Sequence, residues 1–115
     1  LPYDISILEY ANKLINGDED NRLTDKERIK RQADLLKLLA NPVRLCLLEK
    51  LIDEGECSVT SITSCMEVSQ SAVSQHLRRL KDMGIVNLRK EENRSYYSCK
   101  RKDVEKIIRV LKESV

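Results

Sequence analysis

Apolar residues recur every three or four positions along most of this chain, and that spacing is typical of helices with one buried face. The stripes predict helices at 5–15, 24–40, 42–53, 58–66, 69–83 and 103–115. The helix at 69–83 has the clearest stripe, formed by Ala72, Val73, Leu77, Leu80 and Met83. These residues are therefore expected to be buried, with polar and cationic side chains on the opposite face.

Capping residues mark the ends of several predicted helices. Thr24 and Glu27 have the spacing of a capping box, in which the Thr oxygen accepts a hydrogen bond from the Glu backbone N–H. Asn41-Pro42 both ends one helix and begins the next, because proline is well tolerated in a first helical turn. Ser69 is the expected N-cap of the next long helix, and Gly84 is its expected left-handed terminator.

The pattern changes after Gly84. Residues 85–90 alternate between apolar and polar, 91–93 are turn residues and 94–99 return, which predicts a β-hairpin. A short β-compatible stretch at 56–58 precedes the two helices. The order of helix, turn, helix and hairpin is that of a winged helix-turn-helix, a mainly α fold with a small β-hairpin wing.

Charge is unevenly distributed, although the formal net charge of the 115 residues is only +2. Residues 1–27 contain three Lys or Arg and seven Asp or Glu, a net charge of −4. Residues 70–102 contain nine Lys or Arg and three Asp or Glu, a net charge of +6. A basic block over the second motif helix and the wing is typical of a protein that binds a polyanion. A basic but merely solvated surface is the simpler alternative.

Composition limits the class of protein. The chain contains no Trp and no Phe, so Leu, Ile and Val must form its core, and its length fits one domain. With three glycines, one histidine and no phosphate-binding loop it offers no recognisable active site, so we expect neither enzymatic activity nor a cofactor. No apolar run approaches membrane-spanning length and no signal peptide is evident, which favours a cytoplasmic protein with reduced cysteines.

In a winged helix-turn-helix, the first turns of the second helix enter the major groove of DNA. Ser and Gln side chains there can hydrogen-bond to base edges or phosphates, whereas Arg and Lys favour the phosphate backbone. The candidate base-reading residues are Gln70, Ser71, Ser74 and Gln75. The candidate backbone-contacting residues are Arg78, Arg79 and Lys81 in the helix and Arg89, Lys90 and Arg94 in the wing.

These side chains also have plainer interpretations. Ser and Gln at a helix start are often only caps, and the hairpin cations are compatible with a solvated surface. His76 lies beside the apolar stripe, so it is expected to have a structural role or to contact the DNA backbone, and a metal ligand is the remaining alternative. A winged-helix module that binds protein instead of DNA would need an apolar outer face on 69–83, where the sequence has polar and cationic residues.

Three stretches closely resemble the ArsR/SmtB family of bacterial transcriptional repressors. They are LLKLLANPVRLCLLEKL at 35–51, SVTSITSCMEVSQSAVSQHLRRLKDMGIV at 58–86 and RKEENRSYYSC at 89–99, and the similarity extends over 29–115. The resemblance implies a homodimer formed through the N- and C-terminal helices. It also implies that the dimer binds an imperfect palindrome in double-stranded DNA and represses a nearby operon until an inducer binds or reacts. Residues 1–21 would then be a helical extension with an acidic linker, and 22–115 the DNA-binding and dimerisation domain.

Many members of that family sense metal ions, but this chain lacks the ligands of their two best-known sites. At the first site, the positions that match the family's cysteine ligands carry Ser58 and Thr60. At the second, on the last helix, the chain offers Arg101, Asp103 and Ser114 and no histidine. We therefore assign no metal ligand, and a metal-responsive repressor with non-standard ligands is an alternative.

Another branch of the family senses thiol oxidation, persulfide or electrophiles through a cysteine pair. The redox candidates here are Cys46, Cys57, Cys65 and Cys99. Cys46 lies in the helix where the family places one partner, about one turn earlier, but the last helix has no cysteine. Pairing of 56–58 with the wing would bring Cys57 near Cys99. Alternatively these two, and Cys46, fill apolar core positions, and Cys65 is the most exposed.

Overall fold

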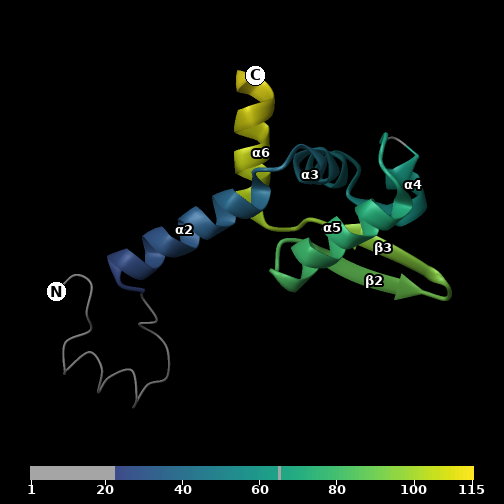
Figure 1. Cartoon of the computed structure of the whole chain (residues 1–115), viewed down its shortest axis with the longest axis horizontal. Coiled ribbons are helices and arrows are strands. Elements are labelled where there is room, and N and C mark those ends of the chain that lie inside the picture. The colour runs from purple at the N-terminus through teal and green to yellow at the C-terminus, as the bar shows by residue number, and fades with distance from the viewer. Residues whose placement is uncertain (1–22, 65) are drawn as a thin grey trace, which may run out of the picture. The chain divides into compact units, whose positions relative to one another are not determined.

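The computed structural model describes residues 23–64 and 66–115. The order of elements in them is α2, α3, β1, α4, α5, β2, β3 and α6 (Figure 1). The chain divides into two compact units, residues 1–38 and 39–115. The predicted helix at 5–15 lies outside the described residues.

Helix α2 (Asp25–Leu39) begins at the predicted capping box. The backbone N–H of Glu27 donates to Thr24 Oγ1 at 3.1 Å, and the Thr24 hydroxyl donates to the Glu27 carboxylate at 2.9 Å. The apolar stripe of this helix is largely uncovered, since Ile29 and Leu36 are 55% and 56% exposed. Within the described residues, helix α2 therefore carries large apolar side chains that remain exposed.

Helix α3 (Pro42–Glu54) starts and ends at the residues that the sequence indicates. The Asn41 side chain accepts hydrogen bonds from two first-turn backbone N–H groups, at 2.9 and 3.1 Å. Such a cap contributes about 1 kcal/mol, because those donors have no partner within the helix. At the other end, Gly55 adopts a φ of +90° and its N–H donates to the Leu51 carbonyl at 2.8 Å.

Helices α4 (Val59–Thr63) and α5 (Gln70–Asp82) form the helix-turn-helix. Ser58 caps the first and Ser69 the second, each through a side-chain oxygen that accepts from a first-turn backbone N–H at 3.2 and 3.1 Å. Helix α4 is shorter than predicted. Gly84 terminates the α5 region with a φ of +76°, as expected.

A three-stranded antiparallel sheet completes the fold. Its strands are β1 (Glu56–Ser58), β2 (Asn87–Glu91) and β3 (Arg94–Ser98), and their order is β1-β3-β2. The hairpin of β2 and β3 is the predicted wing, and β1 pairs with the returning strand. The molecule is thus a mainly helical winged helix-turn-helix, which confirms the fold class expected from the sequence.

The prediction that the first wing strand starts at residue 85 was wrong. Ile85 and Val86 are buried, but they precede β2, and their backbone N–H groups donate to the Leu80 carbonyl at 2.8 and 3.4 Å. These residues therefore close the end of α5 and connect it to the sheet. Their apolar character reflects burial, not strand alternation.

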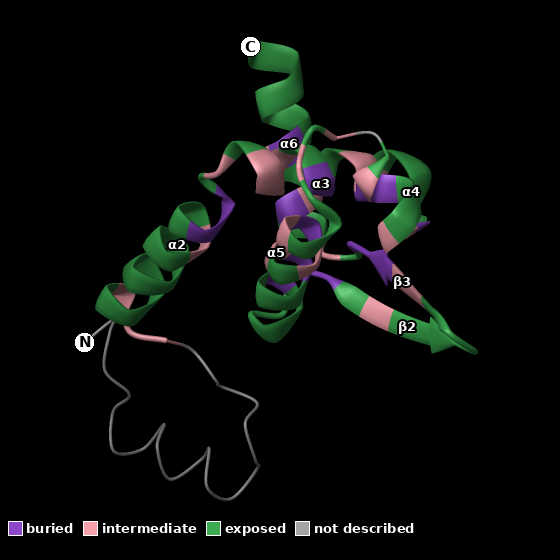
Figure 2. Ribbon diagram, turned by 45° about the vertical axis from the view of Figure 1, so that its right-hand side comes forward, coloured by how far each residue is buried: buried purple, intermediate pink, exposed green. Residues whose placement is uncertain are grey.

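The core of the second unit lies where α3, α5, α6 and the sheet meet, and Figure 2 shows burial concentrated there. Its aliphatic members include Leu47, Leu48, Leu51, Ile62, Val73, Leu77, Leu80, Ile85, Val86, Val104 and Ile108. The three α5 residues among them are completely buried, as predicted, whereas Ala72 of the same predicted stripe is half-buried. Met83 is 51% exposed instead, because it is the C-cap of α5 and lies beyond the turn that packs on the core.

Helix α6 (Lys102–Ser114) has two apolar stripes. Val104 and Ile108 face the core, whereas Val110 and Leu111 are 59% and 43% exposed. The Lys112 ammonium also forms an exposed ion pair with α3, 2.9 Å from a carboxylate oxygen of Asp53. One stripe of α6 thus holds the unit together, and the other remains exposed.

The cysteines differ in environment. Cys57 and Cys99 are buried thiols, 4% and 9% exposed, which agrees with core positions, and burial raises the pKa of the Cys99 thiol. Cys46 is an exposed thiol, so the expectation that it is buried was wrong. The core side of α3 carries residues 47, 48 and 51, and position 46 falls outside that stripe. Cys65 lies outside the described residues.

A hydrogen bond joins α3 to α5. Arg44 Nε donates to His76 Nδ1 at 3.2 Å. Because Nδ1 is the acceptor, the ring proton of the neutral imidazole is on Nε2. Partial burial, and then the positive charge of Arg44, lower the pKa of His76. Protonation would place a second N–H against the guanidinium and break this contact.

This contact predicts a specific loss of stability in acid. The unfolded chain titrates near the ordinary histidine pKa of 6.5 and the folded chain at a lower pKa, so acidification protonates the unfolded state first. The contribution of His76 to the free energy of unfolding should therefore be fully present above pH 6.5. It should decline as the pH falls through 6.5 towards the lowered pKa of the folded state. Urea unfolding at about pH 7.5 and about pH 5.5 measures the loss.

The control is His76→Asn, which keeps a hydrogen-bond acceptor near Arg44 but does not titrate. We expect it to lose less stability than the wild type over the same pH interval. Equal losses in the two proteins would show that His76 does not titrate differently in the folded and unfolded states.

Candidate nucleic-acid interface

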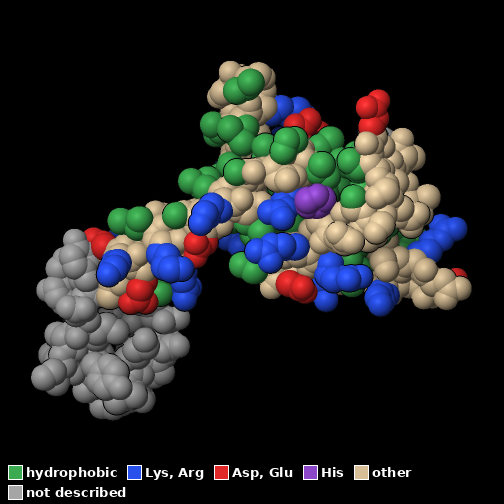
Figure 3. Space-filling view, viewed as in Figure 1, with side chains coloured by type: hydrophobic (Ala, Val, Ile, Leu, Met, Phe, Trp, Pro, Cys, Tyr) green, Lys and Arg blue, Asp and Glu red, His purple; other side chains and the backbone are tan. Residues whose placement is uncertain are grey.

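Burial of one stripe of α5 turns its polar face outward. The exposed residues on this helix include Gln70, Ser71, Gln75, Arg78, Arg79 and Lys81, whereas Ser74 and His76 are half-buried. Figure 3 shows Lys and Arg side chains along this face of the unit, with the histidine among them. The helix therefore presents small polar groups at its N-terminal end and cations towards its C-terminal end.

The N-terminal end of α5 shares a groove with the wing. Gln70 and Ser74 line it together with Thr60 at the start of α4 and with Asn93 and Arg94 at the hairpin tip, and its volume is about 590 Å³. The two consecutive motif helices and the more distant hairpin thus contribute to one concave surface. Ser71 and Gln75 are exposed on α5 but do not line this groove.

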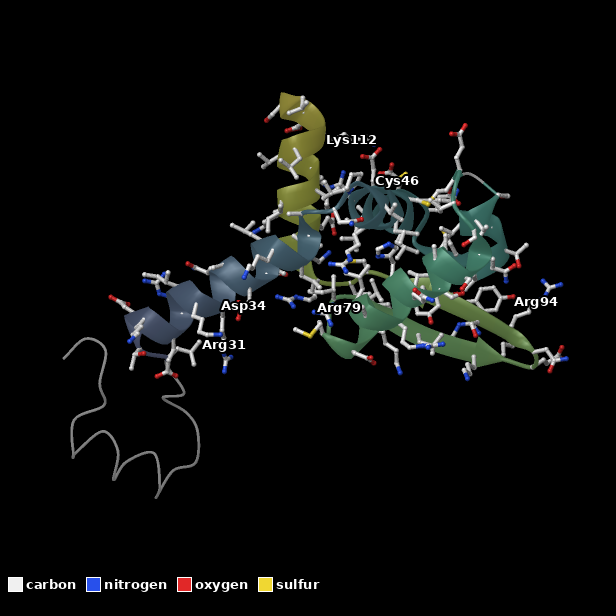
Figure 4. All side chains as sticks on the ribbon, in the orientation of Figure 1. Arg31, Asp34, Cys46, Arg79, Arg94 and Lys112 are labelled. Atoms are coloured by element: carbon white, nitrogen blue, oxygen red, sulfur yellow. The ribbon has the colours of Figure 1, made fainter. Side chains whose placement is uncertain are left out.

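The hairpin tip gives the wing its shape. Glu91 pairs with Arg94, so Glu92 and Asn93 form the loop between the strands. Glu92 has a φ of +55°, a left-handed conformation that non-glycine residues seldom adopt. Figure 4 places Arg94 at this end of the hairpin and Arg79 on α5. Lys90 and Arg94 are both exposed, so the predicted wing cations are accessible.

Arg89 is exposed like the other predicted wing cations, but two carboxylates and an aromatic ring contact its guanidinium. Its Nε and one terminal nitrogen donate to the Glu56 carboxylate at 3.1 and 2.9 Å, and the other terminal nitrogen donates to Glu91 at 3.0 Å. The guanidinium carbon also lies 4.6 Å from the centre of the Tyr96 ring. Hydrogen bonds from Arg89 lower the pKa of Glu56.

Sequence reasoning missed two contributors to this surface. Arg44 is not among the predicted residues, yet it holds His76 on α5 from a position 32 residues earlier. Glu56 is not among them either, and its partner Arg89 is 33 residues away. No local spacing marks such pairs. The only available signal was the fold itself, which places α3 beside α5 and β1 in the same sheet as the wing.

The positions where relatives were expected to hold metals have other roles here. Ser58 caps α4 and Thr60 lines the groove. Asp103 accepts from Arg101 at 3.0 Å, and that bond lowers the pKa of its carboxyl. Within residues 23–64 and 66–115, no group of three or more His, Cys, Asp or Glu side chains could hold a metal ion. In the same residues, no helix is long and apolar enough to cross a membrane.

Comparison with known proteins identifies the family. The family model described as "Bacterial regulatory protein, arsR family" matches residues 41–87, which span α3 to the start of β2. The transcriptional activator HlyU of Vibrio cholerae is 44% identical over 77 residues, which cover 67% of this chain and 70% of HlyU. The transcriptional repressor PagR of Bacillus anthracis is 34% identical over 79 residues, with coverages of 69% and 79%.

Solved structures agree with the sequence comparison. A predicted DNA-binding transcriptional regulator from E. coli has a TM-score of 0.73 and 33% identity, covering 78% of this chain and 95% of its own. The structure of reduced HlyU from Vibrio cholerae has a TM-score of 0.69 and 40% identity, covering 75% and 90%. The chain therefore belongs to the arsR family of bacterial regulatory proteins, which are DNA-binding transcriptional regulators and not enzymes.

Proposed function

We propose that this protein is a sequence-specific repressor that binds an imperfect palindrome in double-stranded DNA as a homodimer and is released by an inducer. The observation that carries the proposal is the groove in which Gln70 and Ser74 of α5 meet Arg94 of the wing. It brings side chains able to hydrogen-bond to base edges beside a cation able to bind the phosphate backbone. PagR, a relative, is itself named a repressor.

Each part of the surface has a proposed role. Gln70, Ser71, Ser74 and Gln75 contact base edges in the major groove, where Gln can bind adenine through two hydrogen bonds. Backbone contacts come from His76, Arg78, Arg79, Lys81, Lys90 and Arg94. His76 would donate through Nε2, since Nδ1 is already bonded to Arg44. In this proposal Nδ1 has a structural role, through Arg44, and Nε2 binds the DNA backbone.

The homodimer is supported by uncovered apolar surface. Ile29 and Leu36 of α2, and Val110 and Leu111 of α6, are large, exposed and apolar. Apolar stripes on two long helices are unusual on a monomer of this size and mark surfaces for association. A dimer with twofold symmetry would present two α5 helices to the two halves of a palindrome.

The proposed inducer acts on a thiol. Cys46 is the exposed cysteine among the described residues, whereas Cys57 and Cys99 are buried. One of the related structures is that of reduced HlyU, which supports a redox-dependent state in that relative. Because α3 packs on α5, modification of Cys46 on the outer side of α3 would alter how α5 is presented to DNA. The alternative is a metal-responsive repressor with non-standard ligands.

The DNA-binding proposal predicts two different mutational effects. A preferred duplex is first selected from a randomised pool, and affinities for it and for a random duplex are measured by fluorescence anisotropy. Gln75→Ala should reduce affinity for the preferred duplex about 5- to 100-fold while changing affinity for random DNA little. Arg94→Ala should weaken binding to both duplexes and reduce the salt slope by about 1, because one phosphate is no longer neutralised.

The same assay can contradict the proposal in two ways. Selection that yields no preferred duplex would rule out sequence-specific binding. Equal losses on both duplexes for Gln75→Ala and Arg94→Ala would show that base contacts and backbone contacts are not divided between α5 and the wing.

The dimer proposal is tested at the exposed stripe of α6. Val110→Asp should raise the dimer dissociation constant at least about tenfold, because it would bury an unpaired carboxylate. Val110→Ile keeps the apolar character and serves as the control. Sedimentation velocity measures both, and a wild-type chain that sediments as a monomer at micromolar concentration would contradict the proposal.

The thiol proposal predicts reversible release from DNA. With a chelator present throughout, glutathione disulfide should form a mixed disulfide on Cys46, release one glutathione and dissociate the complex, and dithiothreitol should restore binding. Cys46→Ser should stay bound, whereas Cys99→Ser should respond like the wild type. Wild-type binding that ignores the oxidant, or release of Cys46→Ser, would refute the thiol mechanism and favour another inducer.

A further inference from the structure

The Arg89 side chain crosses the outer face of the sheet from one edge strand to the other. It starts on β2, passes over the Tyr96 ring on the central strand β3, and reaches the Glu56 carboxylate on β1. Its remaining terminal nitrogen bonds to Glu91 on its own strand at 3.0 Å. All three strands are therefore joined through one guanidinium.

The strand register makes this contact possible. Arg89 is paired with Tyr96, and Tyr96 is paired on its other side with Ser58, so these three residues form one row across the sheet. Glu56 lies two residues before Ser58 and thus on the same face. A long planar side chain from β2 can reach it diagonally, with the ring of Tyr96 beneath.

The two residues of this contact belong to different parts of the fold: Glu56 to the strand before the helix-turn-helix and Arg89 to the wing. Glu56 begins β1, which is only three residues long and runs directly into Ser58, the N-cap of α4. Helix α4 in turn packs against α5. Arg89 belongs to the hairpin that carries Lys90 and Arg94. The side chain thus connects the wing to the strand that leads into the helix-turn-helix.

We propose that Arg89 is a positioning residue: through Glu56 and Tyr96 it fixes the wing relative to the helix-turn-helix, and it does not itself bind DNA phosphates. This inference rests on the proposed backbone contacts of the wing. It also gives Arg89 a different role from Lys90 and Arg94, although the three cations form one basic cluster in the sequence.

Electrostatics favours this role over a phosphate contact. A phosphate that captured Arg89 would leave the carboxylates of Glu56 and Glu91 without this partner beside a polyanion. Arg89, Lys90 and Arg94 are all exposed, and the Arg89 side chain is 50% accessible, so it is the carboxylate partners of Arg89, and not its burial, that argue for a different role. Holding the wing in place before DNA arrives reduces the conformational freedom lost on binding, so the Arg89–Glu56 pair raises affinity without touching DNA.

The two roles predict opposite effects for Glu56→Ala. If Arg89 binds phosphate, loss of the competing carboxylate should tighten binding and steepen its salt dependence. If Arg89 positions the wing, the same change should weaken binding about threefold to tenfold, although the protein has become more positive. The control is Glu105→Ala on α6, which removes the carboxylate of another exposed ion pair, with Arg109 at 2.9 Å.

Salt dependence supplies a second, independent measurement. Arg94→Gln should reduce the slope of log affinity against log salt by about 0.9 for the one phosphate that it leaves unneutralised. Arg89→Gln should weaken binding with an unchanged slope. Arg89→Lys should weaken it as well, because an ammonium keeps the charge but cannot make the paired hydrogen bonds to Glu56.

The experiment uses the full chain with the selected duplex and with a random duplex, far below each variant's thermal midpoint, so that unfolding does not contribute. Weaker binding of Glu56→Ala with the slope retained in Arg89→Gln supports the positioning role. Tighter or unchanged binding of Glu56→Ala, or a reduced slope in Arg89→Gln, overturns it. Failure of the wild type to bind either duplex would instead refute the proposed function.

Discussion

Complete burial of one stripe of α5 is the constraint on which the rest of the structure depends. Val73, Leu77 and Leu80 are fully enclosed, and each contributes about 1.5–3 kcal/mol relative to an exposed side chain. In a core without Phe or Trp, these contacts fix the rotation of α5 about its axis. The polar and cationic face is thereby directed outward, so the functional surface is a consequence of packing on the opposite side.

Local chemistry explains what could be predicted from the sequence. The helix ends at Thr24, Asn41, Ser69 and Gly84 depend on hydrogen bonds and backbone angles within a few residues, and the structure has each of them as predicted. The turn residues at 91–93 between two β-compatible stretches likewise predicted a hairpin, although its first strand begins at Asn87 and not at residue 85. The segregation of positive charge into residues 70–102 pointed to the same half of the fold that carries α5 and the wing.

The remaining features depend on contacts that no local pattern encodes. The environment of Arg89 is determined by a carboxylate 33 residues away, and that of His76 by a guanidinium 32 residues away. Met83 and Cys46 have apolar character, but their exposure follows from where α5 ends and from which side of α3 meets the core. A basic cluster in the sequence therefore combines residues with different surroundings in the fold.

The position of the single histidine has a practical consequence. The chain has one imidazole, four Tyr and neither Phe nor Trp, so its aromatic proton NMR spectrum is sparse. That imidazole sits on α5, hydrogen-bonded to α3, at the surface expected to meet DNA. Its ring resonances are consequently a native spectroscopic probe of the interface, and they require neither isotope labelling nor an introduced tag.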